Sequence, residues 1–148
     1  MDVKIKIING GKIPEYKTDG SACADCYCRI EDGFVEIPPH STKLIGLGFA
    51  LEIPEGYEVV IEPRSSFAHK EHGLSIHGEI DYDYRGQLMA NIYNLSPKES
   101  LKIEDGDRIC QIKLQPVYHM NFEEVSELSE TKRGAGGFGS TGKWNGKK

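Results

Sequence analysis

The fold class is decided by residues 44–61, LIGLGFALEIPEGYEVVI, in which two apolar runs flank a turn signal. The first run extends from Leu44 to Leu51, and the second places Tyr57, Val59 and Ile61 at alternate positions. A period of two is typical of a strand with one buried face, and Pro and Gly between the runs mark a turn. The stretch therefore predicts two β-strands joined by a short connection.

The same pattern recurs along most of the chain. Further apolar stretches cover residues 3–7, 34–37, 88–93 and 109–117, and turn signals rich in Gly, Pro, Asn and Asp separate them. Short strands at this spacing are typical of a sandwich or barrel, so we expect an all-β, jelly-roll-like β-barrel. Helix signals are confined to Ser65–His72, where a serine cap precedes and Gly73 follows about two helical turns.

Length and composition indicate one globular domain. The chain has 148 residues, of which 38% are hydrophobic and 28% are charged, an ordinary balance for a folded domain. No apolar run approaches the roughly 20 residues of a membrane helix, and the first ten residues alternate charged and apolar side chains instead of forming a signal-peptide core. We therefore expect a cytoplasmic protein that contacts no membrane, and the net charge of −5 argues against a nucleic-acid partner.

Three segments are expected along the chain. Residues 1–120 form the β-barrel domain, residues 121–132 form an acidic linker with few apolar anchors, and residues 133–148 form a mobile C-terminal arm. The four cysteines, three of them between Cys23 and Cys28, lack the paired spacing of a structural zinc site. We expect free thiols that pack as small hydrophobic side chains.

The C-terminal arm has the most unusual composition. Residues 133–142, RGAGGFGSTG, hold five glycines, whose unhindered backbone N–H groups can wrap closely around an anion. Arg133, Ser140 and Thr141 add phosphate donors, and Phe138 is placed to stack on a flat ring. The glycine pattern matches the dinucleotide and P-loop fingerprints only by accident, because the helix that both require does not follow. The alternatives are a lid over a ligand and a disordered Gly-rich tail.

Four upstream segments carry further polar groups. They are Ala22-Cys23-Ala24-Asp25, Pro63-Arg64-Ser65-Ser66, Gly78-Glu79-Ile80-Asp81-Tyr82-Asp83-Tyr84-Arg85-Gly86 and Gly106-Asp107-Arg108-Ile109-Cys110-Gln111. A guanidinium, two hydroxyls and a helix start suit the oxyanions of a phosphate, while a carboxylate held near phosphorus can take a proton from water as general base. Taken singly, each segment also fits a plain role: a solvated acid, a serine cap, an acidic turn or a hairpin entry.

Taken together and in this order, the five segments resemble the five motifs of the trimeric dUTPase family. The resemblance spans residues 22–142 and so covers nearly the whole chain. It implies a dUTPase-like jelly roll and a homotrimer whose active sites are shared between subunits. It also implies hydrolysis of dUTP to dUMP and pyrophosphate, a reaction of nucleotide metabolism that keeps uracil out of DNA.

The resemblance further implies a role for each matching residue. Asp81 is the general base that activates water for attack on the α-phosphorus, and Tyr84 packs beneath the deoxyribose and leaves no room for a 2′-hydroxyl. The phosphates are held by Arg64, Ser65, Ser66 and Gln111. The nucleoside is met by Ser75, Gly78, Ile80 and Met89. In the arm, Phe138 stacks on uracil, while the γ-phosphate is enclosed by Arg133, Gly139, Ser140 and Thr141.

Magnesium is the cofactor that the resemblance implies. The ion is bound mainly by the substrate triphosphate and waters, and Asp25 contributes through a water. This agrees with the tendency of Mg²⁺ to keep several waters and to take few protein ligands. The arm reaches the site of a neighbouring subunit, and we expect it to become ordered only over bound nucleotide.

Three departures from the family pattern affect the site. Cys23 and Cys26 flank the first-motif acid in place of Gly and an aliphatic residue. Ser75 replaces an Asn that reads uracil, in a shortened segment, so base recognition rests more on backbone groups near Gly78 and Ile80. His77 and Glu79 add polarity beside the pocket.

Two other functions remain open on the sequence. A dCTP deaminase would share the fold and the Arg-Ser-Ser segment, but Tyr84 and Phe138 favour the pyrophosphatase. A nucleotide-gated binding protein would use the same trimer and arm to signal to a protein partner. Because every catalytic position of the resemblance is filled, hydrolysis is the preferred hypothesis.

Overall fold

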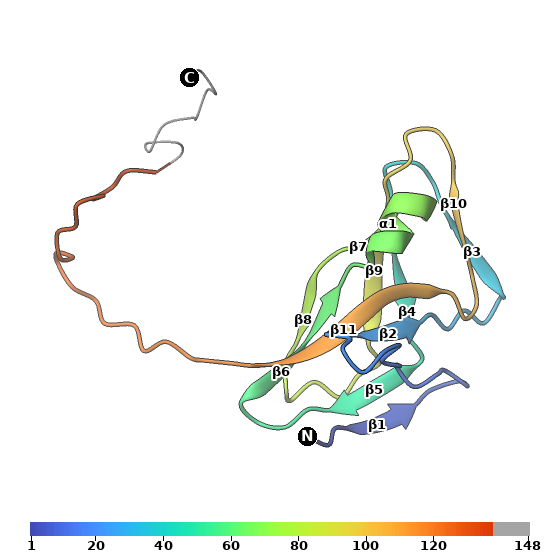
Figure 1. Ribbon diagram of the computed structural model, residues 1–148, viewed down its shortest axis with the longest axis horizontal. Helices are drawn as coiled ribbons and strands as arrows, with labels where there is room; N and C mark the ends of the chain where they lie inside the picture. Colours follow the sequence, from blue (N-terminus) through green and yellow to red (C-terminus); the bar gives the residue numbers. More distant parts are fainter. Residues whose placement is uncertain (138–148) are drawn as a thin grey trace. The chain divides into compact units, whose positions relative to one another are not determined.

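The computed structural model describes residues 1–137, and Figure 1 shows how its strands are arranged. Contacts divide the chain into a compact unit, Met1–Tyr118, and a second unit that begins at His119. All strands and helices of the described part lie in the first unit. The strands are β1 (Lys4–Ile7), β2 (Ala24–Tyr27), β3 (Phe34–Ile37), β4 (Thr42–Gly46), β5 (Phe49–Glu52), β6 (Tyr57–Glu62), β7 (Gly73–Ser75), β8 (Gly78–Ile80), β9 (Met89–Asn94), β10 (Leu101–Glu104) and β11 (Arg108–Pro116).

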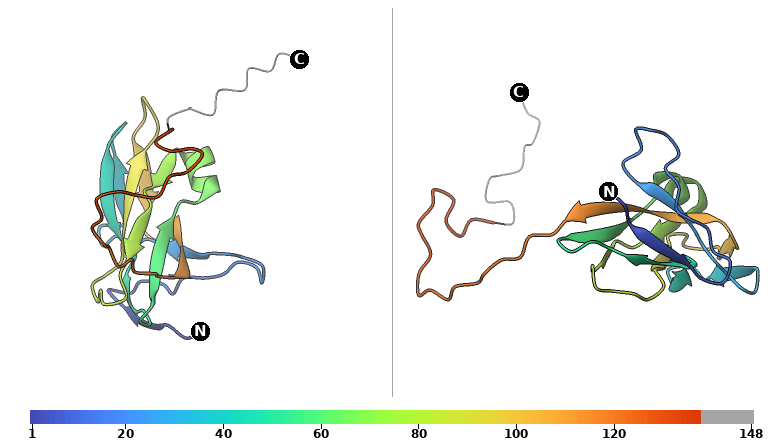
Figure 2. Two further views of the ribbon diagram at one scale, coloured as in Figure 1. Left: turned by 90° about the vertical axis from the view of Figure 1, so that its left-hand side faces the viewer. Right: turned by 90° about the horizontal axis from the view of Figure 1, so that it is seen from below.

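The strands of the first unit pair in four antiparallel groups that wrap around one core (Figure 2). The groups are β1-β5, β3-β10, β4-β9-β7 and β2-β11-β6-β8. Large apolar side chains fill the space between them, and the largest fully buried ones include Phe49, Phe67, Leu47 and Ile92. The expected all-β, jelly-roll-like fold is confirmed.

The stretch at residues 44–61 forms three strands, not the two that its pattern predicts. The first apolar run divides into β4 and β5 because Gly48 adopts a positive φ of 72° between them. A Cβ at Gly48 would lie 2.7 Å from the Cα of Gly11, so this break also lets two backbone segments pack closely. The later turn at Gly56, with φ of 82°, joins β5 to β6 as expected.

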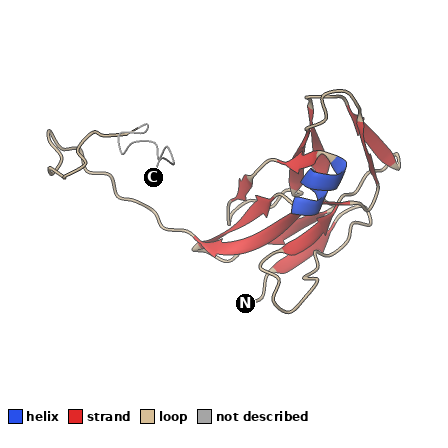
Figure 3. Cartoon of the chain, turned by 45° about the horizontal axis from the view of Figure 1, so that its top comes forward, coloured by secondary structure: helices blue, strands red, loops and turns tan. Residues whose placement is uncertain are grey.

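The helix α1 (Ser65–Glu71) lies against the strands as the single helix of the described part (Figure 3). The predicted serine cap is wrong, because Arg64 occupies the N-cap position and no side chain caps the helix. The helix ends at Glu71, and the C-cap residue His72 adopts a left-handed conformation. Gly73 instead allows close packing, since a Cβ there would lie 2.2 Å from Cζ of Phe67. No helix among residues 1–137 has the length and apolarity needed to cross a membrane.

The four cysteines are free thiols, and three of them belong to the core. Cys26 and Cys110 face each other across β2 and β11, and both are fully buried. A hydrogen bond with Cys110 and burial hold the pKa of the Cys26 thiol above its usual range. These thiols therefore pack as neutral hydrophobic side chains, as expected.

Candidate active site

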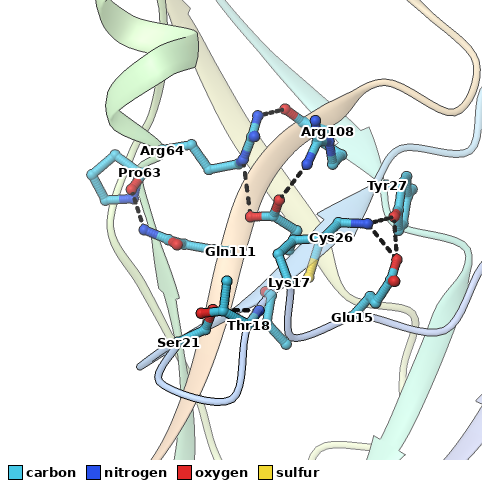
Figure 4. A network of polar contacts seen from close by, with 12 residues as sticks. Glu15, Lys17, Thr18, Ser21, Cys26, Tyr27, Pro63, Arg64, Arg108 and Gln111 are labelled. Carbon is cyan, nitrogen blue, oxygen red and sulfur yellow. Dashed lines mark hydrogen bonds and ion pairs between the residues drawn. The ribbon is translucent and has the colours of Figure 1, made fainter.

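An ion-pair network joins the acid of the first motif to two arginines (Figure 4). Asp25 lies on β2, and its side chain is only 12% exposed. Arg64 donates from Nε to Oδ1 of Asp25 at 3.0 Å, and Arg108 donates from Nη1 to Oδ2 at 2.9 Å. One carboxylate therefore fixes two guanidinium groups that come from different parts of the chain.

Strand pairing brings these residues together. Gln111 on β11 is the register partner of Asp25 on one side and of Glu62 on the other. Its amide Nε2 donates to the carbonyl of Pro63 at 2.8 Å, and Arg64 donates from Nη1 to the carbonyl of Arg108 at 2.6 Å. Two side-chain hydrogen bonds, from Gln111 and from Arg64, therefore connect residues 63–64, which follow β6, to β11.

A small polar pocket of about 190 Å³ opens beside this network. It is lined by Arg64, Ser66, Glu71, Asp107 and Arg108. Guanidinium groups with free N–H donors and a hydroxyl form a set suited to phosphate oxygens. Ser65 and Gln111 do not belong to this lining. Ser65 is exposed, and Gln111 contacts the carbonyl of Pro63, next to Arg64.

A second pocket of about 310 Å³ contains some of the residues expected around the nucleoside. It is lined by Leu44, Glu79, Ile80, Asp81, Tyr84, Gln87 and Met89. Four of these, Ile80, Asp81, Tyr84 and Met89, are site residues that the sequence predicts. The pocket combines an apolar wall, an aromatic ring and a carboxylate.

The carboxylate of Asp81 is carried on a tight turn that directly follows β8. The backbone N–H of Tyr84 donates to the carbonyl of Asp81 at 3.1 Å. Arg85 closes the turn by donating from Nη1 to the carbonyls of Tyr82 and Tyr84, at 2.6 and 3.1 Å. The Asp81 side chain is exposed, so water and substrate can reach it.

The ring of Tyr84 is held by two contacts. Its hydroxyl donates to the carbonyl of Gln87 at 3.1 Å. The ring also lies over Gly86, where a Cβ would be 2.3 Å from Oη and 2.5 Å from Cζ of Tyr84. The absence of a side chain at Gly86 therefore lets the ring form one wall of the pocket.

Two further predicted residues of the first unit, Ser75 and Gly78, belong to neither lining. Ser75 is 1% exposed in β7, and its Oγ has no hydrogen-bond partner. Gly78 begins β8, where a Cβ would only touch Ile61 at 3.9 Å. In the second unit, Arg133 donates from Nε to the carbonyl of Gly136 at 2.7 Å. The predicted residues Phe138, Gly139, Ser140 and Thr141 lie outside the described residues.

These two pockets share no lining residue. The phosphate-type pocket holds Arg64 and Arg108, whereas the nucleoside-type pocket holds Asp81 and Tyr84. The residues expected to act on one nucleotide are therefore distributed over two linings.

Several residues of these linings, among them Arg108 and Leu44, have no role assigned from the sequence. Arg108 belongs to a quoted motif, but only the strand register, which pairs it with Tyr27 next to Cys26, shows that it reaches Asp25. Leu44 is 58% exposed on β4, and a partly exposed leucine in an apolar run gives no sequence signal of a pocket. Both depend on contacts between distant segments.

This chain is similar in sequence and in fold to known proteins. The dUTPase family model matches residues 9–142. A deoxyuridine 5′-triphosphate nucleotidohydrolase of Nautilia profundicola is 48% identical over 97% of this chain and 100% of its own length. The dUTPase of Staphylococcus bacteriophage 80alpha, solved with dUpNHpp, is 28% identical with a TM-score of 0.84, covering 95% of this chain and 98% of that one.

A further solved structure supports the fold alone. The dUTPase of phage phi11 of S. aureus, whose structure describes a structural Mg(II) ion, is 22% identical with a TM-score of 0.77. The alignment covers 86% of this chain and 98% of that one. On the family match and the identity to the Nautilia enzyme, this chain belongs to the dUTPase family.

Proposed function

We propose that this protein is a dUTP diphosphatase, which hydrolyses dUTP to dUMP and pyrophosphate. The observation that carries the proposal is the pocket in which Asp81, Tyr84 and Met89 meet, in a chain of the dUTPase family. An exposed carboxylate, an aromatic wall and an apolar surface are the groups that a nucleoside and an attacking water require together.

Asp81 acts as the general base. Its carboxylate accepts a proton from water, the resulting hydroxide attacks the α-phosphorus, and the bond between that phosphorus and the bridging oxygen of the β-phosphate breaks. Pyrophosphate leaves with the electron pair. The turn that fixes the Asp81 backbone to Tyr84 holds the base in place, and a positioned general base contributes about 10²- to 10⁴-fold.

Tyr84 and the apolar lining select the nucleoside. The ring, held between Gly86 and the carbonyl of Gln87, presents a flat face to the sugar. A ring fixed in this position leaves no space for a 2′-hydroxyl. The enzyme would therefore accept dUTP and reject UTP. Leu44 and Met89 supply the apolar surface beside it.

Arg64 and Arg108 hold the phosphates. Asp25 uses only part of its acceptor capacity on them, because an ionised carboxylate has about four lone-pair sites. The remaining sites fit a water of hydrated Mg²⁺, so Asp25 would hold the ion through water while the triphosphate binds it directly. The ion, when bound, neutralises phosphate charge. Ser65, Ser66 and Gln111 complete the phosphate end.

We extend the proposal to a homotrimer whose sites combine residues of different chains. The support is that the two pockets of one chain share no lining residue. The arm, with Arg133, Phe138, Gly139, Ser140 and Thr141, would close the site of a neighbouring subunit. Exposed Tyr118, Met120 and Phe122 give the segment before it an apolar side for that neighbour.

The activity is tested by pyrophosphate release from dUTP and Mg²⁺. We expect Asp81→Asn to lower kcat by about 10²-fold or more, because the general base is lost. Asp83→Asn is the matched control. This substitution removes the same charge from the same turn, but Asp83 lies outside the pocket lining. Equal activity of both variants, or ammonia release from dCTP by the parent protein, would contradict the proposal.

Shared sites are tested by mixing two inactive variants. Co-expressed Asp81→Asn and Arg64→Ala chains should recover about a quarter of the parental activity in a randomly assembled trimer population, and about a third in the mixed trimers alone, because half-sites combine at random. Recovery occurs only where an intact Arg64 and an intact Asp81 come from different chains. No recovery in mixed trimers of confirmed composition would show that each chain builds its own site.

A further inference from the structure

The strand that carries Asp81 is held by few backbone contacts. β8 has three residues and is the last strand of its sheet, so only β6 pairs with it. The register comprises Val59 with Ile80, Val60 with Glu79 and Ile61 with Gly78. Short edge strands have low local stability, so the position of Asp81 needs further support.

His77 directly precedes β8, and its imidazole lies between two carboxylates. Its Nδ1 is 3.5 Å from Oε2 of Glu62, and its Nε2 is 3.8 Å from Oε1 of Glu79. Glu62 ends β6, two residues before Arg64, whereas Glu79 lies on β8, two residues before Asp81. The imidazole therefore lies between the strand that leads to the phosphate end and the strand that leads to the base.

Glu62 is itself anchored on its other side. Its Oε1 accepts from Nζ of Lys113 on β11 at 2.6 Å, two residues beyond Gln111. The hydrogen bond from Lys113, and to a smaller degree the neighbouring His77, hold the pKa of Glu62 below its usual range. Glu62 is therefore a fixed negative charge, and the charged groups around His77 are Glu62, Glu79 and, behind Glu62, Lys113.

The protonation state of an imidazole between two carboxylates decides how many of them it can bind. A neutral ring has one N–H and donates to one carboxylate, whereas the protonated ring donates to both and carries a positive charge. Imidazole changes its charge between pH 5 and 8. Because His77 and Glu79 belong to the same segment, the contact that ties this segment to β6 is the one with Glu62, and protonation turns that contact into an ion pair.

We propose that His77 is a positioning residue for the reaction, which in its protonated form fastens β8 to β6 and so holds Asp81 in register with the phosphate-binding segment. Glu79 also lines the nucleoside pocket, so the second contact of the ring, with Glu79, orients one wall of that pocket. His77 does not touch the reacting atoms in this role. The inference rests on the proposed dUTP hydrolysis.

The kinetic test compares the pH profiles of the parent protein and His77→Gln for dUTP hydrolysis. We expect the parent kcat to exceed that of the variant about two- to fivefold at pH 6 and to match it at pH 8, with KM nearly unchanged. Glu62→Gln should show the same dependence, because it removes the carboxylate of β6 that the imidazole contacts. His69→Gln, an exposed histidine of α1, is the matched control and should leave the profile unchanged.

A second readout does not depend on activity. Hydrogen-exchange protection factors of the Glu79 and Ile80 amides should be higher at pH 6 than at pH 8 in the parent protein, and equal at both in His77→Gln. A ratio of parent to variant kcat that is the same at every pH would overturn the inference. So would protection factors of the Glu79 and Ile80 amides that are the same in the parent protein and in His77→Gln. Failure of dUTP hydrolysis itself would reject the proposed function, while the exchange data still decide the role of His77.

Discussion

The substitution Gly86→Ala tests how closely the pocket wall is fixed. The new Cβ would lie 2.3 Å from Oη and 2.5 Å from Cζ of Tyr84, where ordinary contacts begin near 3.4 Å. The ring therefore has to retreat by about 1 Å, which also breaks its hydrogen bond to the carbonyl of Gln87. Because Tyr84 is 44% exposed, it can swing outward, and we expect the free energy of unfolding to fall by less than about 1 kcal/mol.

The expected effect is on catalysis. A misplacement of about 1 Å near the reacting groups can cost 10²-fold, so we expect kcat/KM for dUTP to fall about 10- to 100-fold. The ratio of kcat/KM for dUTP to that for UTP should also fall, because the displaced ring no longer excludes a 2′-hydroxyl. The assay is pyrophosphate release from each nucleotide, with thermal unfolding measured on the same preparations.

The matched control is Gly20→Ala. A Cβ at Gly20 meets no atom within 4 Å, so the same added methyl group should leave kcat/KM and the dUTP preference unchanged. A folded Gly86→Ala protein with the parental kcat/KM and the parental dUTP-to-UTP ratio would refute the assigned role of the Tyr84 ring.

Three further predictions concern the ion-pair network, the arm and the core. Asp25→Asn should raise KM for dUTP about tenfold in steady-state assays, because Arg64 and Arg108 lose their shared charged acceptor; an unchanged KM would contradict this. Truncation after Thr131 should lower kcat/KM at least about tenfold while the melting temperature stays constant, since the arm contributes to ligand closure alone. Burial raises the pKa of Cys28 from 9.0 to about 11, so its contribution to stability is complete below pH 9 and is lost as pH rises to 11. Urea unfolding under reducing conditions should show a loss of about 1 to 3 kcal/mol over that range, with a smaller slope in Cys28→Ser.

Sequence patterns identify the longer strands well, since β6, β9 and β11 each carry an apolar run. They do not identify β2, because its inward side chains are Ala24 and Cys26, which carry little apolar signal. β8 has only three residues, and its assignment depends on pairing with β6.

The candidate site shows the same division between local and distant information. Asp81 and Tyr84 belong to one turn, so a single segment of sequence predicts their common lining. Arg108 meets Asp25 only through the pairing of two strands, and the two residues are 83 positions apart in the chain. The contact of His77 with Glu62 likewise depends on how β8 docks beside β6, which no local pattern encodes.

The separation of the two pockets has a consequence for inhibitor chemistry. The nucleoside-type lining contains no arginine or lysine, so a compound directed at this pocket needs no phosphate mimic in order to bind there. An uncharged heterocycle that stacks against Tyr84 and fills the space beside Leu44 and Met89 would compete for the nucleoside position and leave the guanidinium groups hydrated. Such a compound would cross lipid bilayers far more readily than a triphosphate analogue, because it carries no ionic groups to desolvate.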